Sequence, residues 1–436
     1  MFSIKNILSA LFAVVVMMLV PLRGQSFSIL AHEAIIDAEW DLTLKKILLK
    51  KYPDATLDDL IKAHSYAYGG SLVLDIGYMP GGNAYFTDLM HYVRSGDFIT
   101  NLLHEEHSLN EYAFALGALS HYIADQYGHS MATNVTVPEL YPKLKAKFGN
   151  VVTYDEDHLS HSRMEFAYDV VQVGRSNYAS VAYHDFIGFN IAKEPLQRAF
   201  LKTYGQDLSS LFKNFESSVS IMRWGVKNLF PAMTRQAWKS KRDEIVKVNT
   251  KATKRTFRYK MSSRMYRTEF GSDGSSKPDF KARALAFLIR ILPKIGPLKT
   301  LKFVYPGQQG EKRFVSVFDT IIRKYGTALQ TWDQQGLLLT DINLDTGHPQ
   351  KFGEYKLSDK SYCELLCKLQ KEQFMYMDKE LQQHLITHFE DAEGLHQLFK
   401  DHPEDIAGVQ QAIAQLRTFN VQENKIKNTT GSSATD

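Results

Sequence analysis

Cysteine is almost missing from this chain of 436 residues, which contains only Cys363 and Cys367. So few thiols exclude a disulfide framework, and a chain of this length can bury a core without one. The two cysteines stand four residues apart in SYCELLCKLQ, a segment with helical periodicity. Because a disulfide between adjacent turns of a regular helix is geometrically awkward, we expect two half-buried thiols.

Strand-like alternation is also scarce, whereas helix-period patterns recur along the chain. The sequence therefore predicts an all-α, multi-helix fold. Besides the metal-ligand segments considered below, helices are expected at residues 195–230, 281–294, 314–332, 359–392 and 404–418. Breaks are expected in GSDGSSKP, residues 271–278, and in DTGHPQKFGEY, residues 345–355.

The N-terminus carries the chain's one long apolar run, from Ile7 to Val20, preceded by Lys5. Small residues, Gly24 and Ser26, stand at the −3 and −1 positions of a cleavage site. The run is shorter than the roughly 20 residues of a spanning helix, which makes an uncleaved anchor the weaker alternative. We expect residues 1–26 to be a signal peptide and the protein to be exported, either periplasmic or secreted.

Two short motifs carry the strongest chemical signal. HYIADQYGH places His121, Asp125 and His129 four residues apart, and HSRME places His161 and Glu165 at the same spacing. On a helix these side chains project from one face at steps of roughly 6 Å, so their nitrogens and oxygens can converge on a cation. Imidazole and carboxylate together suit zinc.

An i,i+4 pair such as HSRME alone is more often a solvated surface pair. HYIADQYGH, however, follows the apolar stretch EYAFALGALS, in which Gly117 and Ala118 would let another helix approach closely. A polar triplet in a buried helix is costly unless its members are paired or bind metal. Further candidates lie upstream: Asp75 is in a Gly/Pro-rich loop, His91 is on the helix that follows, and His32 is near the mature N-terminus.

This ordered series resembles the zinc-dependent phospholipase C family, which shares its all-helical trinuclear-zinc architecture with secreted single-strand-specific zinc nucleases. The resemblance covers roughly residues 27–190. It implies that the protein binds three zinc ions, with two as the minimum. It assigns Asp75, His91, His121 and Asp125 to the first zinc, and His129, His161 and Glu165 to the second. A third zinc would be held by His32 and the N-terminal residue Phe27, with Asp125 bridging it to the first.

Two features depart from the family pattern. The three-residue gap between Asp125 and His129 is shorter than in many members, so substrate cannot be carried over. Phe27 stands where the family usually has Trp, but the ligands there are the backbone amine and carbonyl. The exchange of one aromatic residue for another therefore leaves the zinc chemistry intact.

These motifs predict a zinc-dependent phosphodiesterase, most simply a phospholipase C acting on phospholipids, with Asp75 as a candidate to orient or deprotonate water. One alternative is a secreted nuclease or nucleotidase, whose partner would be nucleic acid. A second is a non-catalytic protein that uses metal for structure and its extension for binding. Length and composition suggest a metal domain at 27–250, a helical extension at 251–423 and a disordered tail at 424–436.

Three further features stay open in the sequence. Twelve Lys or Arg lie between Arg235 and Arg267, interleaved with aromatic residues, which suits an anionic membrane surface, single-stranded nucleic acid or a solvated helix face. His384 and His388 have helical spacing, but we expect ordinary surface histidines because no carboxylate or Cys pattern accompanies them. His184 follows the last predicted ligand and could reach the mouth of the site.

Overall fold

The computed structural model describes residues 29–79, 82–174, 188–212, 214–224, 304–390 and 394–421, with a few isolated positions between 226 and 253. Within these ranges the regular structure is helical, apart from one isolated bridge between Asn343 and His348. The predicted all-α fold is thus confirmed. Residues 1–28, the tail from 422, nearly all of the basic stretch and the helix expected at 281–294 lie outside the described residues.

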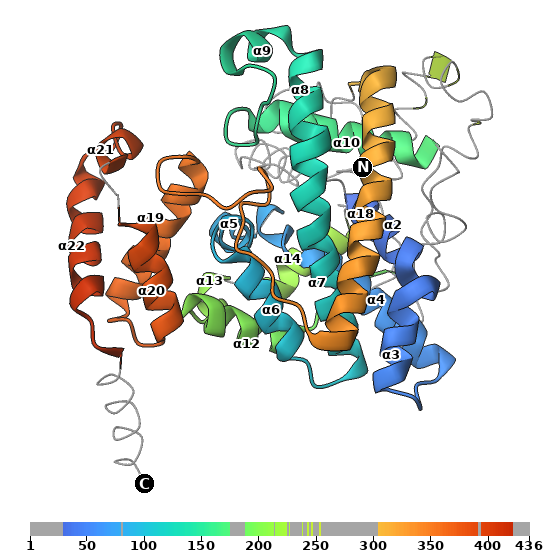
Figure 1. Ribbon diagram of the computed structural model, residues 1–436, viewed down its shortest axis with the longest axis horizontal. Helices are drawn as coiled ribbons and strands as arrows, with labels where there is room; N and C mark the ends of the chain where they lie inside the picture. The colour runs from blue at the N-terminus through green and yellow to red at the C-terminus, as the bar shows by residue number, and fades with distance from the viewer. Residues whose placement is uncertain are drawn as a thin grey trace, which may run out of the picture.

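The N-terminal half is a bundle of short and medium helices around one long helix, α7 (Figure 1). Its elements, in order, are α2 (Ile29–Glu39), η1 (Trp40–Leu44), α3 (Lys45–Lys51), α4 (Leu57–Val73), η2 (Ile76–Tyr78), α5 (Ala84–Tyr92), α6 (Ser95–His104), α7 (Leu109–Gly128), η3 (His129–Thr133), α8 (Asn134–Leu140), α9 (Pro142–Phe148), α10 (His158–Gly174), α12 (Lys193–Tyr204), α13 (Leu208–Leu211) and α14 (Phe215–Trp224).

The tightest packing in this bundle is between α4 and α7. A Cβ atom on Gly117 would lie 2.0 Å from the backbone oxygen of Ala67, and one on Gly70 would lie 1.9 Å from that of Phe114. Glycine at both positions therefore lets the two backbones touch, as the small residues of α7 predicted. This contact brings the end of α4, and Asp75 after it, beside the histidines of α7.

The C-terminal extension consists of α18 (Gly307–Gln335), α19 (Lys356–Lys371), α20 (Lys379–His388), α21 (Leu395–Leu398) and α22 (Glu404–Thr418). Figure 1 shows α18 alongside α7, with the remaining helices grouped beyond α5 and α13. Helix α18 buries Phe314, Phe318, Ile321 and Tyr325 in the same hydrophobic core as the N-terminal bundle. The Tyr325 hydroxyl also donates to the carbonyl of Leu116, 2.8 Å away.

The predicted helices at 314–332 and 404–418 are confirmed as parts of α18 and α22. The single helix expected at 195–230 is wrong, because Gly205 takes a left-handed conformation that ends α12, and two shorter helices follow. The helix expected at 359–392 is also divided, since Gln373 and Phe374 have positive φ and Asp378 caps a new helix. The break at 345–355 is confirmed, as a loop between α18 and α19.

Both cysteines lie on α19 as free thiols, Cys363 buried and Cys367 partly so, as expected. Among the described helices, none combines the length and apolar character needed to cross a bilayer.

Candidate metal centre

Eight of the nine predicted ligands lie in the described residues, and the structure brings all eight into one buried cluster. None has more than 4% of its surface exposed. Phe27 lies outside the described residues. The cluster members come from four α-helices, one π-helical turn and one short connection: His32 from α2, Asp75 before η2, His91 from α5, His121 and Asp125 from α7, His129 from the start of η3, and His161 and Glu165 from α10.

The first group lies around the Nε2 atom of His91. This nitrogen is 3.5 Å from Asp75 Oδ1, 3.2 Å from Asp125 Oδ2 and 3.3 Å from His121 Nε2. Zinc bonds of 2.0–2.2 Å in a tetrahedron put neighbouring ligand atoms about 3.4 Å apart. The four side chains predicted for the first zinc therefore have the mutual spacing of ligands on one ion.

Backbone carbonyls orient two imidazoles of this group through the ring nitrogen that faces away from the cluster. The Nδ1 atom of His91 is 2.9 Å from the carbonyl of Thr87, and that of His121 is 2.7 Å from the carbonyl of Ser71. A carbonyl can only accept, so each Nδ1 carries a proton, and Nε2 is the ring nitrogen that faces the cluster. Backbone acceptors of this kind are usual behind zinc-binding histidines.

The second group consists of His129, His161 and Glu165. Glu165 Oε1 lies 2.9 Å from His161 Nε2, one helical turn away, and 3.4 Å from His129 Nε2. His129 does not continue the α-helical face of His121 and Asp125, because α7 ends at Gly128 and a π-helical turn begins. That turn directs His129 toward α10, and such local π geometry is common at functional sites.

Asp125 joins the groups. Its Oδ1 lies 3.4 Å from His32 Nε2 and 3.9 Å from His129 Nε2, while its Oδ2 lies 3.1 Å from His121 Nε2. The rings of His32 and His121 also stack, with centroids 4.3 Å apart. One carboxylate therefore faces both the first group and the histidine predicted for the third zinc.

The pKa values in the cluster depend mainly on the attraction between its carboxylates and its imidazoles. Burial alone would lower the pKa of His121, but Asp125 and Asp75 outweigh it and raise that pKa to about 9. Burial would likewise raise the pKa of Asp125, but His121 and His129 hold it well below its usual range. His32 differs: burial, with His121 nearby, lowers its pKa to about 4.

The donor set fits a metal ion. The oxygens of Glu165 and the nitrogens of His161 are buried, and they make no hydrogen bond within the part of the chain that the structure describes. Leaving such groups unpaired costs about 1–3 kcal/mol each, and a cation between them would satisfy them. Among the described residues, three buried groups of His and Asp have metal-binding spacing, and two of them are drawn from the first-zinc ligands together with His32.

The third group contains a residue that the sequence did not reveal. Asp345, from the loop between α18 and α19, joins His129 and His161. It lies within the DTGHPQKFGEY break, an acidic residue in a Gly/Pro-containing loop like Asp75. That signal was present, but nothing in the sequence indicated that a loop 180 residues beyond Glu165 returns to the cluster.

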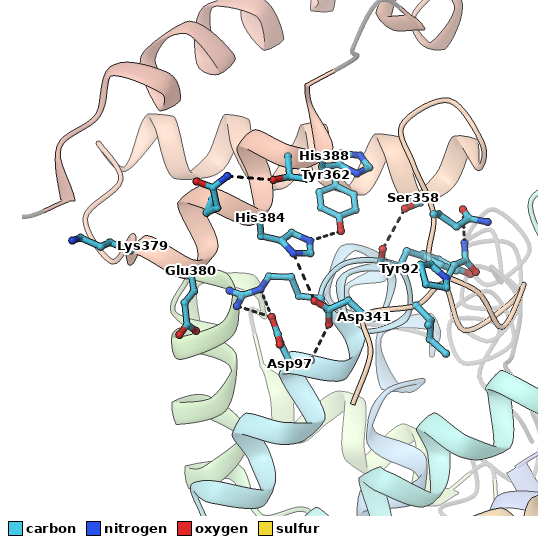
Figure 2. Close-up of a pocket in the computed structure, with 16 residues that line it drawn as sticks. Tyr92, Asp97, Asp341, Ser358, Tyr362, Lys379, Glu380, His384 and His388 are labelled. Atoms are coloured by element: carbon cyan, nitrogen blue, oxygen red, sulfur yellow. Dashed lines mark hydrogen bonds and ion pairs between the residues drawn. The ribbon is translucent and has the colours of Figure 1, made fainter. Parts of the chain in front are cut away.

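His384 and His388 are not ordinary surface residues, so that expectation was wrong. The side chain of His388, 5% exposed, stacks on the ring of Tyr362, with centroids 3.5 Å apart. His384 Nε2 is 2.7 Å from the Tyr362 hydroxyl, and its Nδ1 is 3.6 Å from Asp341 Oδ2. Both line a pocket of about 770 Å³ between α6 and the extension (Figure 2).

Asp97, Asp341 and His384 meet at one wall of this pocket and have metal-ligand types. Arg94 already donates to Asp97 Oδ2 from Nε, 2.7 Å away, and the carboxylates stay partly exposed. Arg94 thus offsets the charge of one of the two carboxylates, and burial raises the pKa of the other, Asp341, to about 7 (Figure 2). None of the eight clustered ligands lines this pocket, and His184 lies outside the described residues.

A helical bundle with buried groups of imidazole and carboxylate side chains at this spacing has the features of a metal-binding protein. Comparison with family models is more specific: residues 32–214 match the family described as zinc dependent phospholipase C. The matched segment contains all eight clustered ligands. The match ends before the extension and so does not include Asp345. Comparison with curated proteins and with solved structures gave no significant match.

Proposed function

We propose that this protein is a zinc-dependent phosphodiesterase that hydrolyses phospholipids in the manner of a phospholipase C. One observation carries the proposal: the eight ligands of the family series, scattered over more than 130 residues, gather in one buried cluster inside the segment that matches the family. A protein that bound metal only as a structural brace would not need a carboxylate such as Asp125 between several groups of ligands.

The chemistry follows from what the residues can hold. Bound zinc would acidify a water, polarise a phosphoryl oxygen and keep the attacking and leaving oxygens in line. Asp75, whose Oδ1 is 3.5 Å from His91 Nε2, would accept a proton from a water beside the first group. The backbone acceptors behind His91 and His121 would keep both Nε2 atoms directed at the metal.

The proposal includes export and processing. Cleavage after Ser26 would leave Phe27 as the first residue, five residues before His32 in the sequence. The mature N-terminus and His32 would then hold a third zinc, with Asp125 shared between this ion and the first. We propose a periplasmic or secreted location on the same basis.

The test is a side-by-side assay of purified, zinc-loaded protein on phosphatidylcholine vesicles, single-stranded DNA and a soluble phosphodiester. We expect release of the phosphorylated head group, at least two zinc ions per chain by elemental analysis, and loss of turnover on chelation. Re-addition of zinc should restore turnover.

Two other outcomes would overturn the proposal in different ways. Preferential cleavage of DNA would keep the metal chemistry but replace the substrate with nucleic acid. Full zinc occupancy without hydrolysis of any of the three substrates would favour the non-catalytic alternative.

A further inference from the structure

The loop between α18 and α19 is built to meet the metal cluster. Asn343 folds it, since its side-chain oxygen accepts from the backbone N–H groups of Asp345 and Thr346, 2.9 and 3.1 Å away. Gly347, at φ 77°, packs so closely on α7 that a Cβ would lie 2.7 Å from the carbonyl of Gln126. A side chain there would force the loop away from the helix that carries His121 and Asp125.

At the tip of this loop, Asp345 is buried and its carboxylate is held on both oxygens. Oδ2 accepts from the Tyr355 hydroxyl and from the backbone N–H of Tyr154, each 2.8 Å away. Oδ1 accepts from Asn134 Nδ2 at 3.1 Å. Donors from three segments thus fix one carboxylate, which has 1% of its surface exposed.

The same Oδ1 faces two predicted ligands of the second zinc. It lies 3.4 Å from Nδ1 of His129 and 3.9 Å from Nδ1 of His161. The other ring nitrogens of both histidines face Glu165. The two carboxylates therefore lie on opposite sides of the imidazole pair, with Glu165 at the Nε2 atoms and Asp345 at the Nδ1 atoms.

We infer that Asp345 is a positioning residue for the second zinc site, acting as the common acceptor behind His129 and His161. This inference rests on the proposed zinc site. It assigns to Asp345 the part that the carbonyls of Thr87 and Ser71 have behind His91 and His121. An anion at Nδ1 holds the proton there, turns the Nε2 lone pairs toward Glu165 and increases their basicity.

The consequence is that the extension, which lies outside the family match, completes the metal centre. The backbone agrees, because the N–H of Leu344 donates to the carbonyl of His91, 3.0 Å away. Two successive residues of the loop thus contact ligands of the first and second groups.

The test compares Asp345→Asn and Asp345→Ala with Asp341→Asn in the full-length protein. Asp341 is the matched control: it also anchors this segment, through Oδ1 and the backbone N–H of Asp97 at 2.9 Å, but its other carboxylate oxygen faces His384 and not a clustered ligand. Zinc number and affinity are measured by chelator competition, without any substrate. We expect one zinc per chain to bind about 10- to 100-fold more weakly in Asp345→Asn, and more weakly still in Asp345→Ala. Asp341→Asn should bind zinc like the parent.

A second measurement separates orientation from docking of the loop. In zinc-loaded protein with labelled histidine, ¹⁵N spectra should show His129 and His161 protonated at Nδ1 and coordinated through Nε2. Coordination through Nδ1 would overturn the inference and make Asp345 a direct ligand. Unchanged zinc affinity in both Asp345 variants, or equal weakening in Asp341→Asn, would also overturn it. None of these results depends on phospholipid turnover, so the inference and the proposed function can fail separately.

Discussion

Asp125→Asn is the substitution that tests the centre most severely. The Asp125 carboxylate faces four imidazoles, with Oδ2 at 3.1 and 3.2 Å from His121 and His91, and Oδ1 at 3.4 and 3.9 Å from His32 and His129. Asparagine keeps the shape but replaces one oxygen with an amide nitrogen that has no lone pair to offer. It also removes the charge that holds the pKa of His121 above its usual value.

The expected loss follows from these contacts. A residue behind a ligand typically contributes 10- to 100-fold in metal affinity or activity, and a carboxylate between two sites should exceed that range at both of them. We therefore expect turnover to fall by at least about 100-fold, with loss of the first and third zinc ions together.

The assay combines elemental analysis with hydrolysis of a soluble phosphodiester, so that membrane binding does not enter. Asp37→Asn is the control, because it disrupts another largely buried aspartate–histidine pair in the same bundle, with His64 3.0 Å from the carboxylate. That variant should retain zinc and turnover. Full zinc occupancy with near-normal turnover in Asp125→Asn would remove Asp125 from the centre.

Three further predictions concern processing, surface charge and packing. Exported protein should begin at Phe27, and extra residues before Phe27 should abolish the third zinc and reduce turnover; equal zinc and turnover would refute a role for the free amine. In the basic stretch, we would replace Lys254, Arg255 and Arg258 with Gln. This change should weaken binding to anionic vesicles in a salt-dependent way but spare hydrolysis of a soluble diester, and unchanged vesicle binding would contradict the prediction. Gly117→Ala should destabilise the fold by about 1–3 kcal/mol in thermal unfolding, because the added Cβ meets backbone 2.0 Å away, whereas Gly408→Ala on α22 has open space and should not.

Local rules predicted which side chains share a helical face, whereas the gathering of all eight in one cluster was implied by the resemblance to the zinc-dependent phospholipase C family. His161 and Glu165 were predicted to converge because they stand one helical turn apart, and their Nε2 and Oε1 atoms lie 2.9 Å apart. The close approach of another helix to α7 was likewise predicted from Gly117, a small residue in an apolar helix, and the structure shows that this helix is α4. Such features are legible because spacing along one helix, or the absence of a side chain, determines the geometry.

Features set by tertiary contacts could not be predicted from the sequence. Helical periodicity continues across Gly205, yet α12 ends there because this residue adopts φ 64°. His388 lacks any neighbouring ligand pattern in the sequence, and its burial arises from Tyr362, on another helix, stacking against it. Periodicity reports which face of a helix is apolar, but not where the chain turns or which helix covers that face.

Asp345 is a residue of the site whose position is set by tertiary contacts and not by local sequence. Composition placed a boundary near residue 250, which separates the metal ligands from the extension, and the family match ends even earlier, at residue 214. Yet α18 shares the core of the N-terminal bundle, and the loop after it hydrogen-bonds to the backbone of His91. A protein truncated at residue 250 would keep all eight clustered ligands but lose the carboxylate behind His129 and His161, and it would expose the apolar face of α7 that α18 covers. The extension is therefore part of the physical unit that holds the centre, and removing it should affect the second zinc before it affects the first.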